Sequence, residues 1–163
     1  MPPHHTTPFA QINVKSALYG MQAVLPHFGT TGRGHIINVS STLGRMPVVL
    51  PRAAYSASKH FLNALTANFR DELRETHPGV AVSLVSPGLV YTDFGGNALH
   101  GGVDSRSLPD GQDVDGVAAV LMQAVETRHP DLYTTPGRKA LVMEYLDGLS
   151  SDPSTVQQPP KQA

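Results

Sequence analysis

A long helical pattern between two short apolar runs constrains the fold of this chain more than any other feature. Residues 52–76 place apolar side chains at helical spacing, on a stripe from Ala57 to Leu73 that we expect to face a sheet. Residues 35–40 and 80–85 are short apolar runs typical of buried strands. Strands joined by a helix of this length pair in parallel through a right-handed crossover. The sequence therefore predicts an α/β fold built on an open, doubly wound parallel sheet.

Other segments continue this alternation of helix and strand. Residues 10–28 and 114–128 carry apolar residues at helical spacing, which predicts a helix in each. Residues 92–111 are rich in glycine and predict a loop. The apolar run at residues 140–146 predicts a last strand.

The two ends of the sequence lack any apolar pattern. Residues 1–9 and 151–163 contain several prolines, so we expect a flexible N-terminus and a disordered tail. The length of 163 residues is typical of one domain, which we place at residues 10–150.

Composition excludes several classes of function. Lys and Arg number 12 against 13 Asp and Glu, and this near-neutral balance argues against nucleic acid or an anionic membrane as partner. The absence of cysteine excludes disulfides and thiol chemistry, and the adjacent His4 and His5 point apart in helix or strand, so we expect no metal site. No apolar run reaches the ~18 residues of a membrane span, and the first residues do not resemble a signal peptide. We therefore expect a cytoplasmic chain that binds a small molecule.

Tyr55 and Lys59 stand four residues apart near the start of the long predicted helix, which places them on one face. A tyrosine has an ordinary pKa of about 10, so it is a poor acid or base at neutral pH. A neighbouring cation favours the phenolate and lowers that pKa. This pair suits proton transfer, although such pairs are common on helix surfaces.

Polar and turn-forming residues follow both predicted strands. Ser41 comes directly after the first strand, and Pro87 and Gly88 come directly after the second. Open α/β sheets bind ligands at the carboxyl ends of their strands, and glycine lets the backbone approach a ligand closely. The sequence therefore predicts a site where these strand ends meet the helix that carries Tyr55.

At these residues the sequence resembles the short-chain dehydrogenase/reductase family. The resemblance covers about residues 10–146. The matching pieces are Asn38-Val39-Ser40-Ser41, Tyr55-Ser56-Ala57-Ser58-Lys59-His60, Ser86-Pro87-Gly88 with Thr92, and the helix from Ile12-Asn13-Val14-Lys15 to Leu25-Pro26-His27. The resemblance implies a Rossmann-type sheet and an oxidoreductase that interconverts an alcohol and a ketone or aldehyde with NAD or NADP.

The family's roles carry over onto matching residues. Tyr55 would exchange a proton with the substrate oxygen, Lys59 would lower the pKa of Tyr55 and bind the nicotinamide ribose, and Ser41 would hydrogen-bond the substrate. Asn13 matches the asparagine that holds a water behind the lysine. The stretch that lies against the nicotinamide would comprise Pro87, Gly88, Val90 and Thr92. Family members are often dimers or tetramers, so we expect a homodimer or homotetramer.

The sequence departs from the family in its first part. The opening strand, glycine-rich turn and helix that hold the cofactor pyrophosphate have no counterpart in this sequence. We therefore expect a truncated Rossmann-type domain, with one strand edge unpaired and weak or absent cofactor binding. A piece of a longer protein or a misplaced gene start is favoured over a degenerate relative because the chemical residues are intact. The alternative function is a non-catalytic assembly or regulatory subunit that keeps the family's helical surface.

Overall fold

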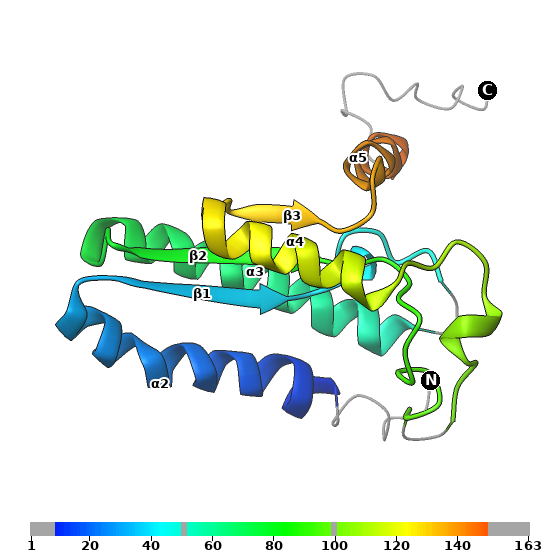
Figure 1. The fold of residues 1–163 in the computed structure, drawn as a ribbon, viewed down its shortest axis with the longest axis horizontal. Helices are drawn as coiled ribbons and strands as arrows, with labels where there is room; N and C mark the ends of the chain where they lie inside the picture. Colours follow the sequence, from blue (N-terminus) through cyan, green and yellow to red (C-terminus); the bar gives the residue numbers. More distant parts are fainter. Residues whose placement is uncertain (1–8, 50–51, 99–100, 150–163) are drawn as a thin grey trace, which may run out of the picture.

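Three parallel strands form the centre of the molecule (Figure 1). The computed structural model describes residues 9–49, 52–98 and 101–149. Its strands are β1 (Gly34–Val39), β2 (Val80–Ser86) and β3 (Asp131–Tyr133), in the spatial order β1-β2-β3. In the register of β1 and β2, Gly34 lies opposite Val80 and Val39 lies opposite Val85. The predicted α/β class and parallel sheet are confirmed.

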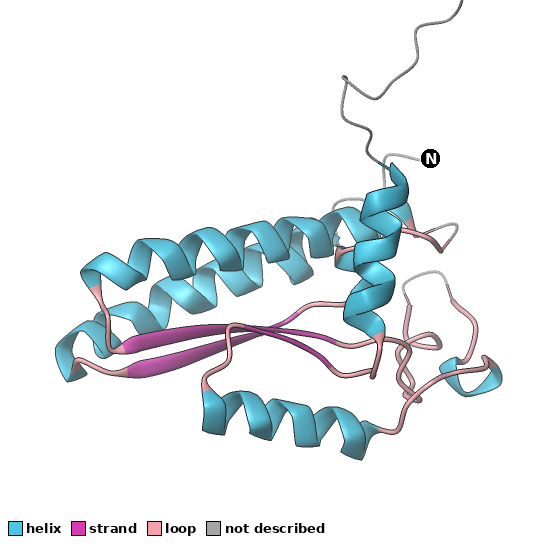
Figure 2. Ribbon diagram, turned by 90° about the horizontal axis from the view of Figure 1, so that it is seen from above, coloured by secondary structure: helices cyan, strands magenta, loops and turns pink. Residues whose placement is uncertain are grey.

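Helices cover both faces of this sheet (Figure 2). Helices α2 (Ser16–Thr31) and α3 (Ala53–Thr76) lie on one face, and α4 (Val114–Thr127) lies on the other. Helix α5 (Arg138–Leu149) follows β3 and crosses the strand direction. Three short helical turns complete the described chain: a π-helix η2 (Ala10–Lys15) and the 3-10 helices η3 (Thr42–Gly44) and η4 (Ser105–Ser107).

The hydrophobic core lies between the sheet and the pair of helices α2 and α3. Its buried members are Met21, Ile36, Leu73, Val80 and Val82, with the partly buried Leu25, Phe28, Leu65 and Phe69 packed against them. Full burial of one such side chain contributes about 1.5–3 kcal/mol, so this layer fixes α3 on the sheet. The core thereby places the first turns of α3 beside the carboxyl ends of β1 and β2.

The predicted strand over residues 140–146 is wrong, because this run lies within α5. The third strand is instead Asp131–Tyr133, which is too short to show a period of two. Short apolar runs fit a strand and a helix equally well on periodicity alone, which explains the error.

The apolar stripe predicted on α3 faces the sheet only in part. Leu62 and Leu73 are buried, whereas Ala57 is exposed and Phe61 keeps 51% of its surface accessible. A spacing of four residues drifts around an α-helix by about 40° per step, because a turn takes 3.6 residues. The first members of the stripe therefore point away from the sheet.

Strand β1 is paired only with β2 among the described residues, so one of its edges is free. A groove of about 260 Å³ follows this edge between β1 and α2, lined in part by Met21, Val24, Phe28 and Ile36. The predicted flexible N-terminus (apart from Phe9) and the predicted tail lie outside the described residues. Across the part of the chain that the structure describes, no helix is long and apolar enough to cross a membrane.

Candidate active site

The predicted site residues come from three neighbouring segments of the fold. Ser41 follows β1 and caps the 3-10 helix η3 with its hydroxyl, which accepts a hydrogen bond from the Leu43 amide at 3.2 Å. Tyr55 and Lys59 occupy the first turns of α3, and Pro87 directly follows β2. The loop after β1 is tied to the end of β2, because the Pro87 carbonyl accepts from the Thr42 amide at 2.8 Å.

The Tyr55 side chain lies at the centre of this arrangement. The rings of Phe9 and Phe94 pack against the Tyr55 ring in edge-to-face contacts, with centroid separations of 5.9 and 5.8 Å. The Nζ atom of Lys59 lies 5.8 Å from the centroid of the same ring, and the Ser41 side chain lies close enough to Tyr55 to lower the pKa of its phenol. The structure therefore brings Tyr55, Lys59 and Ser41 together.

Electrostatics at Tyr55 differ from the expectation for a simple tyrosine–lysine pair. Burial raises the pKa of Tyr55, while the Ser41 hydroxyl and the Arg52 guanidinium act in the opposite direction without overcoming it. Burial also lowers the pKa of Lys59. Tyr55 therefore stays protonated at neutral pH and is available as a proton donor.

Lys59 and Asn13 support the start of α3 through different partners. The Lys59 ammonium donates to the Val39 carbonyl at 3.0 Å, at the end of β1. The Asn13 amide donates to the Ser58 hydroxyl at 3.0 Å, and Ser58 donates to the Tyr55 carbonyl at 2.7 Å. Asn13 therefore contacts the helix turn that bears Tyr55, through a serine that the sequence analysis did not single out.

The segment after β2 packs against later parts of the chain. Val90 forms an isolated parallel bridge with Gln112, and the Thr92 hydroxyl accepts from the Phe94 amide at 3.3 Å. At Gly88 a Cβ atom would lie 2.8 Å from the Thr135 hydroxyl oxygen. The Thr135 side chain therefore occupies the space that glycine leaves beside the backbone at this position.

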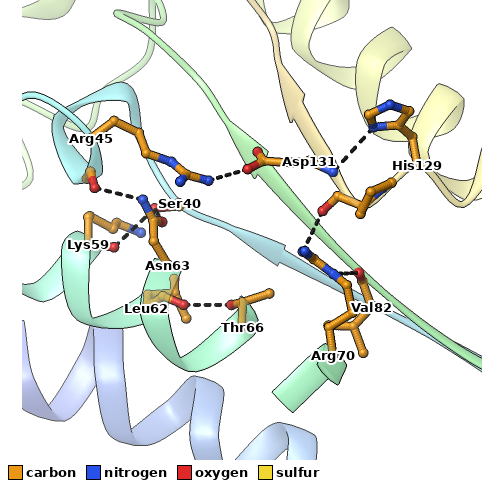
Figure 3. A network of polar contacts seen from close by, with 12 residues as sticks. Ser40, Arg45, Lys59, Leu62, Asn63, Thr66, Arg70, Val82, His129 and Asp131 are labelled. Atoms are coloured by element: carbon orange, nitrogen blue, oxygen red, sulfur yellow. Dashed lines mark hydrogen bonds and ion pairs between the residues drawn. The ribbon is translucent and has the colours of Figure 1, made fainter. Parts of the chain in front are cut away.

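Sequence reasoning missed the groups that hold the serine loop on α3 (Figure 3). Asn63 is buried one turn after Lys59, and its amide contacts Ser40 and Gly44. Arg45, which follows η3, forms an ion pair with Asp131 of β3. An asparagine on the buried face of a helix is the one signal that could have pointed to this contact.

The arrangement combines a phenol, an aliphatic hydroxyl and an ammonium group at one edge of the sheet, which suits proton exchange with a small polar substrate. Among the described residues, no group of three or more histidine or acidic side chains could hold a metal ion.

Comparison with known proteins gives a consistent result. A family model described as short chain dehydrogenase matches residues 4–101. No curated protein matches the chain. A short-chain dehydrogenase from Sphingobium yanoikuyae in complex with NADPH aligns with a TM-score of 0.74 and 24% identity, over 100% of this chain and 60% of that one.

Two further solved structures are similar. A short chain dehydrogenase from Burkholderia cenocepacia in complex with NADP aligns with a TM-score of 0.69 and 29% identity, over 91% of this chain and 57% of that one. A short chain dehydrogenase/reductase from Burkholderia phymatum in complex with NAD aligns with a TM-score of 0.72 and 22% identity. The alignment covers 91% of this chain and 62% of that one. The chain thus spans less than two thirds of the length of each of these structures.

Proposed function

The chain belongs to the short chain dehydrogenase family, and on that premise we propose that it carries the proton-transferring part of an NAD(P)-dependent oxidoreductase. The reaction would interconvert an alcohol and a ketone or aldehyde. The structures with NADPH, NADP and NAD described above support both cofactors equally.

One observation carries this proposal: Tyr55 has the Ser41 hydroxyl beside it and the Lys59 ammonium near its ring. Two hydroxyls that contact each other can both reach a single substrate oxygen. The aromatic rings of Phe9 and Phe94 cover part of the Tyr55 ring, and a less polar surrounding strengthens a hydrogen bond to that oxygen.

Each residue then has a separate task in the reductive direction. Tyr55, held protonated by burial, gives its proton to the substrate oxygen as that oxygen gains negative charge. Ser41 donates a hydrogen bond to the same oxygen and orients it. Lys59 stabilises the phenolate that remains, because its ammonium lies close to the ring. In the oxidative direction the proton moves back from the alcohol to the Tyr55 phenolate.

The donors in the described residues suit one part of the cofactor. The Lys59 ammonium and the Tyr55 hydroxyl fit the hydroxyls of a nicotinamide ribose, and Thr92 offers a further hydroxyl beside the segment that follows β2. When bound, the nicotinamide supplies or accepts the hydride. Pro87, Gly88 and Val90 stay assigned to the nicotinamide face by resemblance.

The pyrophosphate of the cofactor has no comparable place in the described residues. Nucleotide-binding sheets hold it at a glycine-rich turn between a strand and a helix N-terminus. The described strands β1 and β2 are instead followed by the serine loop and by the segment Pro87–Thr92. We therefore assign residues 10–150 to the C-terminal catalytic part of a larger Rossmann domain.

Cofactor titration tests this assignment. We expect the chain alone to bind NADH and NADPH weakly or not at all, as measured by the change in cofactor fluorescence. Micromolar affinity would contradict the assignment. A longer protein read from the same frame, if it contains the glycine-rich turn, should consume NADH or NADPH in the presence of a panel of ketones, and a complete absence of turnover would contradict the enzyme proposal.

An apolar groove beside α3 favours a second copy of this chain as a binding partner. A groove of about 310 Å³ lies between η2 and α3, lined in part by Phe9, Val14, Ala57 and Phe61. Its apolar lining and the exposed Phe61 ring favour a homodimer in which α3 lies at the interface. A non-catalytic assembly or regulatory subunit, the alternative function, would use the same surface. A homotetramer and a cytoplasmic location stay predictions.

A further inference from the structure

The loop that carries Ser41 is joined to α3 by the side chain of Asn63 (Figure 3). Asn63 keeps only 7% of its surface accessible. Its Nδ2 atom donates to the Gly44 carbonyl at 2.7 Å, and its Oδ1 atom accepts from the Ser40 hydroxyl. Both ends of the amide are thus used, and they hold the loop on either side of Ser41.

Hydrogen bonds to β2 hold the same loop from another direction. The Ser40 amide donates to the Val85 carbonyl at 2.8 Å, and the Thr42 amide donates to the Pro87 carbonyl at 2.8 Å. These bonds fix the loop relative to the sheet. They do not fix it relative to α3, on which Tyr55 lies, so the separation of Ser41 and Tyr55 also depends on contacts between the loop and that helix.

The loop reaches α3 at very close range. A Cβ atom built on Gly44 would lie 2.9 Å from Asn63 Nδ2 and 2.9 Å from the Lys59 carbonyl oxygen. The Ser40 hydroxyl also lies 3.4 Å from that same carbonyl oxygen. The contact therefore occurs at the helical turn that joins Lys59 to Asn63, directly beside the candidate acid–base pair.

We propose that Asn63 is a positioning residue, which sets the contact between the Ser41 and Tyr55 hydroxyls by holding Ser40 and Gly44 against α3. The inference rests on the proposed function in that it gives a role in proton transfer to a residue outside the Tyr55, Lys59 and Ser41 set. A buried amide is costly unless its donors and acceptor are satisfied, and a fully satisfied one specifies a single geometry. An apolar side chain of the same size could fill the space without fixing the loop.

The test follows the phenol of Tyr55 by NMR in chain labelled with ¹³C at tyrosine Cζ, the resonance being assigned with Tyr55→Phe. Ser41→Ala serves as the reference, since it removes the hydroxyl that lowers the pKa of Tyr55 and should raise the titration midpoint of that phenol. Asn63→Leu removes the clamp and retains the side-chain size. Gly44→Ala provides a second route, because it forces the loop away from α3 while Asn63 remains.

Thr66→Val is the matched control on the same helix. Thr66 is fully buried, donates to the Leu62 carbonyl at 2.6 Å and accepts from the Asn38 amide at 2.9 Å. The substitution therefore removes buried hydrogen bonds from α3 without touching the serine loop. It should lower the melting temperature and leave the Tyr55 resonance and its midpoint where they are in the unaltered chain.

The expected result is that Asn63→Leu and Gly44→Ala displace the Tyr55 resonance at neutral pH and its midpoint in the same direction as Ser41→Ala, by at least half as much. An unchanged Tyr55 signal in Asn63→Leu overturns the inference, even where its melting temperature falls. No displacement in Ser41→Ala overturns it as well, because the hydroxyl contact would then be absent. None of these readouts needs cofactor, so a failure of the proposed oxidoreductase activity is observed separately, as a lack of turnover.

Discussion

At the scale of single residues, burial is the dominant influence on the tyrosine that the site depends on. Sequence reasoning expected the neighbouring ammonium to make Tyr55 more acidic, yet burial raises the pKa of its phenol. The cation that lowers the pKa of Tyr55 in the structure is Arg52, at the N-cap of α3. A phenol in this state is a better proton donor than acceptor at neutral pH.

Tyr55→Phe should therefore abolish proton transfer while leaving the ring packing in place. In the longer protein that binds cofactor, we expect turnover to fall by roughly 10²–10⁴, the usual contribution of general acid catalysis. Cofactor affinity should stay close to that of the parent, since the ribose contacts of Lys59 remain. Steady-state kinetics and cofactor titration measure the two effects, and retained turnover would reject Tyr55 as the proton donor.

Burial of the phenol also predicts how stability depends on pH. The pKa of Tyr55 is higher in the folded chain than in the unfolded chain, so its contribution is fully present below the unfolded pKa of about 10. As pH rises above that value, the unfolded chain loses its proton more readily and the free energy of unfolding should fall. Urea unfolding above and below this pH measures the decline, which Tyr55→Phe should reduce. An identical decline in both proteins would show that other groups cause it.

At the scale of secondary structure, the long helices and the two buried strands were predictable, whereas the third strand was not. The helices expected over residues 52–76 and 114–128 correspond to α3 and α4, whose apolar residues repeat over several turns. Strand β3 has only three residues and is a strand because it pairs with β2. No local pattern in the sequence therefore marks it. The contact of Asn63 with the serine loop was equally hidden, because it joins residues from two different elements.

One glycine at a junction of elements should tolerate no side chain. At Gly79, which precedes β2, a Cβ atom would lie 2.0 Å from the Gly32 carbonyl oxygen at the end of α2. Backbone cannot yield as a side chain can, so Gly79→Ala should lower the free energy of unfolding by about 1–3 kcal/mol. Urea denaturation measures this change.

Gly116 provides the matched control for that substitution. It is exposed in the first turn of α4 and has nothing within 4 Å of its Cβ position. Gly116→Ala should instead increase stability by about 0.5–1 kcal/mol, because alanine favours the helix. Equal effects of the two substitutions would contradict the close approach at Gly79.

At the scale of the whole molecule, the exposed part of the α3 stripe predicts self-association. Phe61 leaves 51% of its surface accessible beside the groove between η2 and α3. If a second copy packs there, Phe61→Glu would place a charge in an apolar interface and should convert a dimer into a monomer. Analytical ultracentrifugation measures the change, with Phe94→Glu as a control at another exposed phenylalanine. A monomeric parent chain, or a dimer unaffected by Phe61→Glu, would contradict this interface.

All the groups assigned to proton transfer lie between Asn13 and Thr92, in one uninterrupted run from η2 through β1, α3 and β2. The hydrogen bonds between Ser40 and Asn63 and between Thr42 and Pro87 also stay inside this run. A genetic crossover on either side would therefore transfer the complete acid–base chemistry in one event. Evolution could then recombine this block with new nucleotide-binding or substrate-recognising neighbours without having to assemble the tyrosine site again.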